Sequence, residues 1–394
     1  MSIASAHTLR LPQADGTLAA YALSSNMVFP ERAAGAFNRI AFSAAHVVAD
    51  PKADIDPWIT AAIDWDSTIA YRERLWDLGL GVAEAMDTAQ RGMGLDWPTS
   101  LELIRRSVAA ARARTDKGLV FCGVGTDHLD PASARGVDDV IRAYEEQLEA
   151  VEAIGGHVIL MASRALARVA RTPDDYVKVY DRILSQARTP MILHWLGDMF
   201  DPALAGYWGT QDLDQAMNIA LSIIDGHAAK IDGIKISLLD KDKEIDMRRR
   251  LPTSVKMYTG DDFNYAELIA GDAYGYSHAL LGIFDAIAPA ASAALTALAD
   301  GNTDRFNAIL APTVPLSRHI FKAPTRFYKT GIVFMAYLCG HQTHFTMVGG
   351  QESARSILHL SDLFRLADKA GLFHRPDLAI DRMRAVLRVH GIEG

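Results

Sequence analysis

The stretch Ile231-Asp232-Gly233-Ile234-Lys235-Ile236, followed by Ser237, decides how this sequence folds. It is a short apolar run that contains one lysine, and runs of this length are typical of buried strands in a parallel sheet. Successive side chains of a strand point to opposite faces, so Ile234 and Ile236 share one face and Lys235 takes the other. In a closed barrel the isoleucines would face the surrounding helices, and Lys235 would face the interior.

Similar apolar runs alternate with helix-like segments over much of the chain, as in repeated βα units. Two clear amphipathic segments are 137–154 and 173–187, and the second begins with the N-cap signal Thr172-Pro173. The G-x-G-x-x-G signature of an open dinucleotide-binding sheet is absent after the first run. The sequence therefore predicts an α/β protein with a (β/α)8 TIM barrel. The eight expected strands are 39–44, 79–83, 118–123, 157–161, 191–195, 231–236, 254–258 and 273–277.

Two further regions flank the predicted barrel, which we assign to residues 36–285. Residues 1–35 are expected to form a β-hairpin-like extension, because short apolar runs lie on either side of the turn signal Asp15-Gly16. Residues 286–394 are expected to be helical, since the strand pattern stops there and an alanine-rich segment begins. In a barrel enzyme, such a helical region caps one end of the barrel or builds an oligomer interface.

The composition restricts the class of partner. The 394 residues carry a net charge of −8, which argues against broad binding to nucleic acid or to an anionic membrane surface. The richest apolar run, 331–338, is about half as long as a membrane span. The two cysteines suit a reducing compartment, and residues 1–5 do not open a secretion signal. We therefore expect a cytoplasmic protein that acts on a small molecule.

Lys235 is the strongest candidate for a catalytic residue. A lone ammonium group is costly to bury, and burial lowers its pKa toward the range in which the neutral amine can attack a carbonyl group. The alternative is a lysine at the strand mouth that forms a salt bridge with an acid, and the pattern alone leaves both possibilities open.

Two motifs resemble those of the dihydrodipicolinate synthase/N-acetylneuraminate lyase superfamily. Gly233-Ile234-Lys235, with Asp240 shortly after, is similar to the segment that carries the Schiff-base lysine, and Tyr258-Thr259-Gly260-Asp261-Asp262 is similar to the turn after the seventh strand. The resemblance covers about residues 36–330 and indicates a divergent branch of that superfamily. It implies a metal-independent lyase or aldolase without a cofactor, in which Lys235 forms the imine, and a homo-oligomer such as a dimer or tetramer. It also implies that Thr259, Gly260, Asp261 and Asp262 shape the substrate site.

The chain departs from the superfamily at the proton-transfer residue. The family has a tyrosine at the end of the fifth strand, whereas this chain has Leu193-His194-Trp195 there. Because the reference pKa of histidine is near neutrality, His194 is a candidate proton shuttle. A core histidine that bonds to a neighbour is the alternative.

A second departure concerns recognition of the substrate carboxylate. Where the family has a Gly-Thr-Thr-Gly-Glu loop that holds a 2-oxo acid, this chain has Gly81-Val82-Ala83-Glu84, which lacks both hydroxyl groups. An acidic pocket around Gly81 and Glu84 would repel pyruvate and favour a neutral, polyhydroxylated, sugar-derived carbonyl compound. Arg164, after the fourth strand, is a candidate for binding an anionic group of the substrate, or else forms a surface ion pair.

Two other functions remain open from the sequence. One is a metal-dependent barrel isomerase or hydrolase, and the other is a barrel that binds without catalysis. The residues that could bind the metal of an isomerase or hydrolase include no close pair such as His-x-His. The candidate ligands are His46, His128, His157, His194, Glu84, Asp127, Asp198 and His278.

Overall fold

The computed structural model describes residues 8–24 and 28–393, so parts of the predicted N-terminal extension lie outside the described residues. The chain forms two compact units. The barrel unit comprises residues 39–45 and 80–282. The helical unit comprises the described parts of residues 1–38, together with 46–79 and 283–393.

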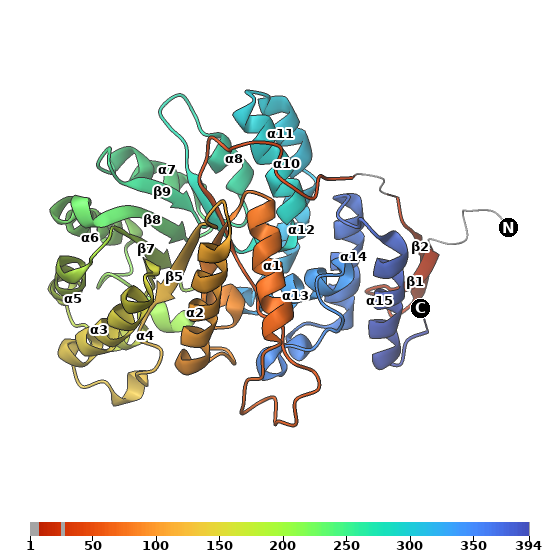
Figure 1. The fold of residues 1–394 in the computed structure, drawn as a ribbon, viewed down its shortest axis with the longest axis horizontal. Helices are drawn as coiled ribbons and strands as arrows, with labels where there is room; N and C mark the ends of the chain where they lie inside the picture. Colours follow the sequence, from red (N-terminus) through yellow and green to blue (C-terminus); the bar gives the residue numbers. More distant parts are fainter. Residues whose placement is uncertain (1–7, 25–27, 394) are drawn as a thin grey trace. The chain divides into compact units, whose positions relative to one another are not determined.

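The barrel unit confirms the predicted TIM barrel. Its eight strands close in the order β10-β3-β4-β5-β6-β7-β8-β9, and every neighbouring pair is parallel (Figure 1). The strands are β3 (Ala41–Ala44), β4 (Gly81–Glu84), β5 (Val120–Val124), β6 (His157–Leu160), β7 (Met191–Leu196), β8 (Ile231–Ser237), β9 (Lys256–Thr259) and β10 (His278–Leu281).

The barrel interior is filled by one side chain from almost every strand, as period-two alternation requires. In β8 the corresponding position is Gly233, and a Cβ atom there would lie 2.6 Å from the ring of Tyr258. The glycine therefore leaves room for this aromatic ring. The buried cluster includes Phe42, Ala83, Phe121, Ile159, Ile192, Tyr258 and Leu280.

The two helices whose bounds were predicted, 137–154 and 173–187, begin and end at or within one residue of those positions. The predicted helix 137–154 is α3, and Thr172 forms a capping box with Asp175 at the start of α5. The helices are α2 (Trp97–Ala113), α3 (Val137–Ile154), α4 (Arg164–Val169), α5 (Pro173–Gln186), α6 (Leu213–Gly226), α7 (Lys241–Arg250) and α8 (Tyr265–Ala270).

The eighth strand was predicted in the wrong place. The predicted segment 273–277 belongs to a turn in which Asp272 bridges Gly275, and Tyr274 is 81% exposed. The strand follows as β10, His278–Leu281, which is buried after its first residue. Tyrosine is common in strands because it packs well on a half-buried sheet. Tyr274 and Tyr276 lie in an exposed turn instead, outside the sheet.

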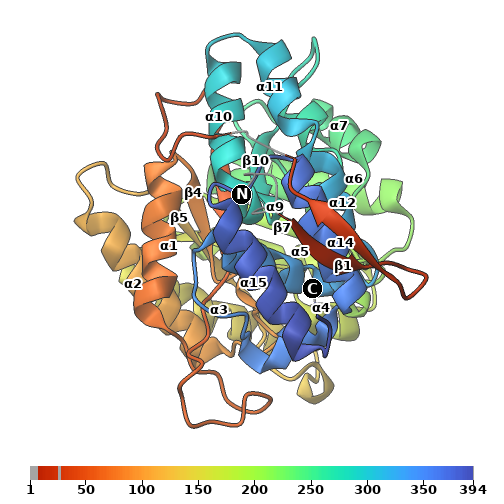
Figure 2. The same cartoon turned by 90° about the vertical axis from the view of Figure 1, so that its right-hand side faces the viewer.

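The helical unit begins with the hairpin of β1 (Thr8–Pro12) and β2 (Leu18–Ala22), which pair antiparallel. Figure 2 shows β1 close to α15, and the Tyr21 hydroxyl donates a hydrogen bond to Asp368 of α14 at 2.7 Å. The other helices are α1 (Trp65–Asp77), α9 (Ile283–Ala286), α10 (Ala288–Ala299), α11 (Thr303–Leu310), α12 (Thr313–Ile320), α13 (Tyr328–Cys339), α14 (Ile357–Lys369) and α15 (Pro376–Val389). None of the helices in residues 8–24 and 28–393 has both the length and the hydropathy for a membrane span.

Candidate active site

Lys235 lies on β8, among the inward-facing side chains of the barrel. It pairs in register with His194 of β7 and with Tyr258 of β9, and it is 7% exposed. Lys235 has the same strand parity as Gly233, which faces the Tyr258 ring in the barrel interior. This position agrees with the inward orientation that the alternation of β8 predicts.

The surroundings of Lys235 act on its pKa in opposite directions. Burial lowers the pKa of the amine, because an ammonium ion loses its hydration there. The negative charges of Asp262 and Asp87 raise it again, and the net shift is downward. Lys235 makes no hydrogen bond or close ion pair with any residue in the described part of the chain. A larger fraction of this amine is therefore neutral than for a lysine in water.

His194 stands next to Lys235 in the same layer of the barrel. Its Nε2 lies 3.3 Å from Ser237 Oγ, and its Nδ1 is buried without a hydrogen-bond partner in the described ranges. Burial, together with the charge of Lys235, lowers the pKa of His194 well below its usual value. At neutral pH the ring is therefore neutral, with one nitrogen that donates and one that accepts.

The turn after β9 brings main chain close to the lysine. A Cβ atom on Gly260 would lie 2.5 Å from Ile236 O and 2.7 Å from Lys235 Cε, so only glycine fits without displacement. The Gly260 N–H donates to Ile236 O at 2.8 Å and fixes the turn against β8. Of the motif, Gly260 touches the lysine side chain, and Asp262 acts on it through its charge.

The remaining two residues of this motif support the turn. The Asp261 carboxylate accepts hydrogen bonds from the main-chain N–H groups of Phe263 and Asn264 at 2.8 and 3.0 Å. Thr259 hydrogen-bonds to Glu244 of α7 on the outer side of the strand. Both residues therefore hold the loop in place, and neither lines the pocket described next.

A pocket opens beside His194, at the carboxyl ends of β4 to β7. Its polar side chains are three aspartates and two arginines, together with His194 and Thr126. Catalytic groups of TIM barrels are found at this end of the strands. The five charged lining residues are Asp87, Arg91, Asp127, Arg164 and Asp201.

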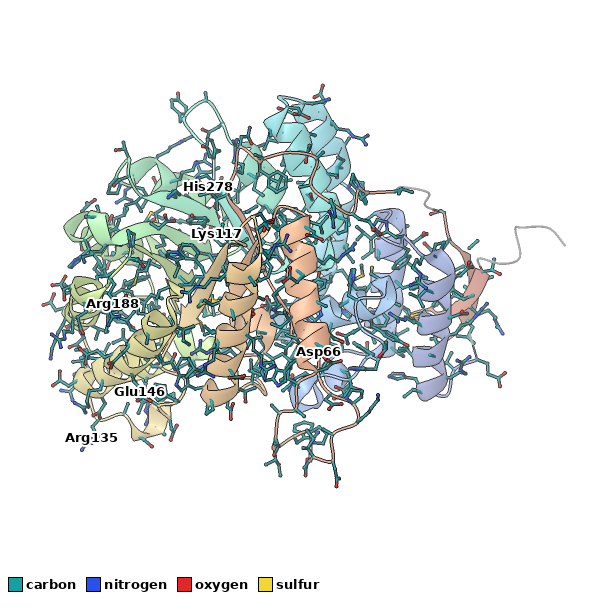
Figure 3. All side chains as sticks on the ribbon, viewed as in Figure 1. Asp66, Lys117, Arg135, Glu146, Arg188 and His278 are labelled. Carbon is teal, nitrogen blue, oxygen red and sulfur yellow. The ribbon has the colours of Figure 1, made fainter. Side chains whose placement is uncertain are left out.

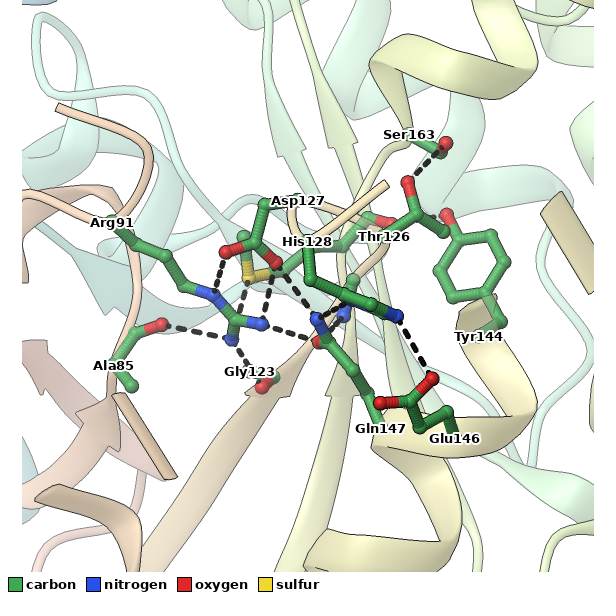
Figure 4. Close-up of polar contacts among 12 residues, drawn as sticks. Ala85, Arg91, Gly123, Thr126, Asp127, His128, Tyr144, Glu146, Gln147 and Ser163 are labelled. Atoms are coloured by element: carbon green, nitrogen blue, oxygen red, sulfur yellow. Dashed lines mark hydrogen bonds and ion pairs between the residues drawn. The ribbon is translucent and has the colours of Figure 1, made fainter. Parts of the chain in front are cut away.

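A dense network holds one wall of this pocket (Figure 4). Arg91 binds both carboxylate oxygens of Asp127, at 3.1 and 2.7 Å, and also donates to Gln147. Its other nitrogen donates to the main-chain oxygens of Gly123 and Ala85. All five N–H groups of Arg91 are thus used within the protein, so this arginine is a structural part of the wall.

Arg164, the first residue of α4, also lines the pocket, and its guanidinium lies beside Gly92. Its Nε donates to Asp201, and its side chain is 39% exposed. Its two terminal nitrogens make no hydrogen bond within the described residues. The sequence suggested either a substrate ligand or an ion pair, and the geometry allows both at once.

Of the seven residues expected to bind substrate, only Arg164 is in the lining of this pocket. Gly81 is the first residue of β4, where a Cβ atom would lie 2.7 Å from the Phe42 ring. Glu84 follows the inward-facing Ala83, so its side chain points outward and accepts a hydrogen bond from Ser107 of α2. The acidic residue of the loop is Asp87 instead, which lies three residues further along.

Asp87, Arg91, Asp201 and Ser237 are site residues that were not predicted from the sequence. The segment that resembles the superfamily loop ends at Glu84, but the chain turns at Ala85, whose φ is 53°, and enters the pocket afterwards. A left-handed φ at a residue other than glycine is uncommon and indicates a constrained turn. The available signal was the polar pair Asp87-Thr88, which follows the end of β4 after two residues.

The histidines and acids proposed as metal ligands are dispersed. His278 is the first residue of β10 and lies at the opposite end of the barrel unit from Glu146, which contacts His128 at 3.3 Å (Figure 3). His46 belongs to the helical unit, where its Nδ1 lies 2.8 Å from Asp285. In the described ranges, no three histidine, cysteine or acidic side chains form a potential metal-binding group.

Comparisons with known proteins agree with this barrel. One solved structure with the same fold is YagE of E. coli K12, a prophage protein of the dihydrodipicolinic acid synthase family in complex with pyruvate. The match has a TM-score of 0.65 at 14% identity and covers 86% of this chain and 100% of that chain. Dihydrodipicolinate synthase from Aquifex aeolicus matches with a TM-score of 0.63 at 12% identity, over 86% of this chain and 99% of that chain.

At these identities the matches establish the fold. No curated protein matches the sequence. The family model described as "Protein of unknown function (DUF993)" matches residues 9–392. The chain therefore belongs to the DUF993 family and has the barrel fold of the dihydrodipicolinate synthases.

Proposed function

We propose that the protein is a metal-independent lyase or aldolase that forms a Schiff base through Lys235. The observation that carries this proposal is a buried lysine in the barrel interior, with a lowered pKa and without a hydrogen bond to the described residues. A lysine that served only to pair with an acid would have a close carboxylate partner. The shared fold with dihydrodipicolinate synthases supports the same class of reaction.

The reaction begins when the neutral amine of Lys235 adds to the substrate carbonyl carbon. The carbonyl oxygen leaves as water, and a protonated imine remains on Nζ. In the cleavage direction, the bond between the next two substrate carbons breaks, and its electrons move into the imine to give an enamine. The hydroxyl proton of the departing carbon is taken up by a base, so that this carbon leaves as an aldehyde. Protonation of the enamine carbon and hydrolysis of the imine restore the free lysine.

His194 is the residue we assign to proton transfer. It lines the pocket, pairs in register with Lys235 and bonds to Ser237. Because its ring is neutral, it can accept a proton at one nitrogen while the other nitrogen donates. We expect His194→Phe to lower turnover far more than it lowers imine formation. Unchanged turnover would remove His194 from the mechanism.

The direct test is borohydride trapping with a panel of 2-oxo acids and keto-sugars, followed by peptide mass mapping. We expect a reduced adduct on Lys235, and no adduct in Lys235→Arg. Lys256→Arg is the matched control, because Lys256 begins a strand of the same barrel and pairs with Asp232 at 2.6 Å. An adduct on another lysine, or none with any compound of the panel, would contradict the proposal and favour a non-catalytic binding protein.

We further expect a homo-oligomer in the cytoplasm with a role in carbohydrate metabolism. The oligomer follows from the resemblance to dihydrodipicolinate synthases, and light scattering of the purified protein measures it. A monomer at micromolar concentration would refute that expectation without affecting the imine chemistry.

A further inference from the structure

The three pocket aspartates differ in what they bind. Asp127 is held by Arg91 and also accepts a hydrogen bond from Gln147 at 3.0 Å. Asp201 is held by Arg164. The carboxylate of Asp87 makes no hydrogen bond to any residue in the ranges that the structure describes. Asp87 is partly buried in the pocket lining, and both of its carboxylate oxygens can therefore accept hydrogen bonds from a ligand.

The position of Asp87 relates it to the reacting group. Asp87 lines the same pocket as His194, which pairs in register with Lys235, and its negative charge raises the pKa of that lysine. Its charge also raises the pKa of Arg164, another lining residue. A ligand that forms an imine on Lys235 and extends past His194 into this pocket would meet Asp87 in its lining.

The charges of the pocket disfavour an anion at this position. The lining has three aspartates and two arginines, which leaves one negative charge in excess. Arg91 cannot offset it toward a ligand, because all its N–H groups bind protein acceptors. Arg164 has free terminal nitrogens, but Asp201 already pairs with it. A carboxylate beside the imine carbon would face Asp87 without a free cation between them.

We propose that Asp87 is a specificity-determining residue, which accepts a hydrogen bond from a hydroxyl group of the substrate and excludes 2-oxo acids. The substrate class is then a neutral hydroxyketone or hydroxyaldehyde. Free N–H groups of Arg164 bind a more distant hydroxyl oxygen. This inference rests on the proposed Schiff-base function and specifies the substrate of that site.

The test compares two small probes, dihydroxyacetone and pyruvate, in borohydride trapping at Lys235 followed by intact mass. We expect the wild-type protein to trap dihydroxyacetone at least tenfold faster than pyruvate. In Asp87→Asn the ratio of the two rates should fall by about tenfold to a hundredfold, because a charged hydrogen bond and a like-charge repulsion are both removed. The ratio is the informative quantity, since any change in the pKa of Lys235 affects both probes equally. Asp87→Thr, which replaces the charge with a hydroxyl group, should move the ratio in the same direction.

Asp225→Asn is the matched control, because Asp225 is exposed on α6 and its loss removes the same charge. It should leave the ratio unchanged. Faster trapping of pyruvate by the wild-type protein, or an unchanged ratio in both Asp87 variants, would overturn the specificity role while the imine function stands. If neither probe forms an adduct on Lys235, but a 2-oxo acid of the larger panel does, the specificity role also falls. If no compound of either set is trapped, the imine function itself fails, and the inference fails with it.

Discussion

Replacing Gly260 with alanine tests whether the turn after β9 positions Lys235 for the proposed imine chemistry. The added Cβ would lie 2.5 Å from Ile236 O and 2.7 Å from Lys235 Cε, whereas ordinary contacts begin at 3.4 Å. It would lie still closer to Ser237 Oγ. A main-chain oxygen cannot move aside as a flexible side chain can, so the turn and β8 must separate by about 1 Å to restore an ordinary contact. Overpacking of this kind lowers the free energy of unfolding by about 1–3 kcal/mol.

The same displacement should act on the chemistry. Misplacement of a reacting group by about 1 Å can reduce a rate on the order of a hundredfold. We therefore expect Gly260→Ala to trap carbonyl compounds about tenfold to a hundredfold more slowly than the wild-type protein. The assay combines the borohydride trapping rate with urea unfolding followed by circular dichroism, so that a folded but poorly reactive variant is recognised.

Gly226→Ala is the matched control for this experiment. Gly226 ends α6, and a Cβ atom there meets nothing within 4 Å. Alanine is a better helix former than glycine, so stability should stay equal or rise by up to about 1 kcal/mol, with trapping unchanged. Wild-type trapping and stability in Gly260→Ala would refute the view that this glycine is required for the close approach to Lys235.

Three further predictions follow from the charges. Burial lowers the pKa of Lys235, and the charge of Asp262 raises it. In Asp262→Asn the amine should therefore lose its proton at lower pH, so the pH at which borohydride trapping becomes fast should decrease. An increase in that pH would contradict this. Arg91→Lys should lower the free energy of urea unfolding by about 2–4 kcal/mol, because Asp127 loses its bidentate hydrogen bonds to the guanidinium group. A loss below about 1 kcal/mol would count against a stabilising role of this network. Burial lowers the pKa of His359 to about 2, so the unfolded chain binds a proton there below about pH 6.5 while the folded chain does not. Stability should thus fall as the pH drops from 7 to 5, and His359→Phe should reduce that fall by about 1–2 kcal/mol; an equal fall in both proteins would argue against it.

The sequence predicted the barrel because its strands are buried on both faces. Seven strands lie within about two residues of their predicted positions, since apolar runs of this kind have few alternatives in an α/β protein. The eighth failed because Tyr274 and Tyr276 have high strand propensity but lie in an exposed turn. Whether an aromatic residue packs on a sheet depends on tertiary contacts that a local pattern does not contain.

For the site, the sequence predicted what depends on parity and missed what depends on the loops. Lys235 and His194 face inward because each lies on a strand, where alternation fixes the direction of the side chain. Glu84 also lies on a strand, but its parity directs it to Ser107 on the outside. The pocket acid had to be sought beyond the strand, where φ of 53° at Ala85 redirects the chain. No period predicts a turn of this kind, so the place of Asp87 in the pocket followed only from the three-dimensional structure.

These two acids lead to different expectations for the chemistry. The carboxylate of Glu84 bonds to Ser107 outside the barrel, and its charge is not among those that shift the pKa of Lys235. Asp87 raises the pKa of Lys235, which works against the effect of burial and keeps part of the amine protonated when no substrate is bound. In the proposed reaction, the nitrogen becomes a protonated imine after attack on the substrate carbonyl, and the same carboxylate would stabilise that positive charge. The group that slows the first attack therefore favours the intermediate, and a neutral hydroxylated substrate can bind beside it without adding a second negative charge.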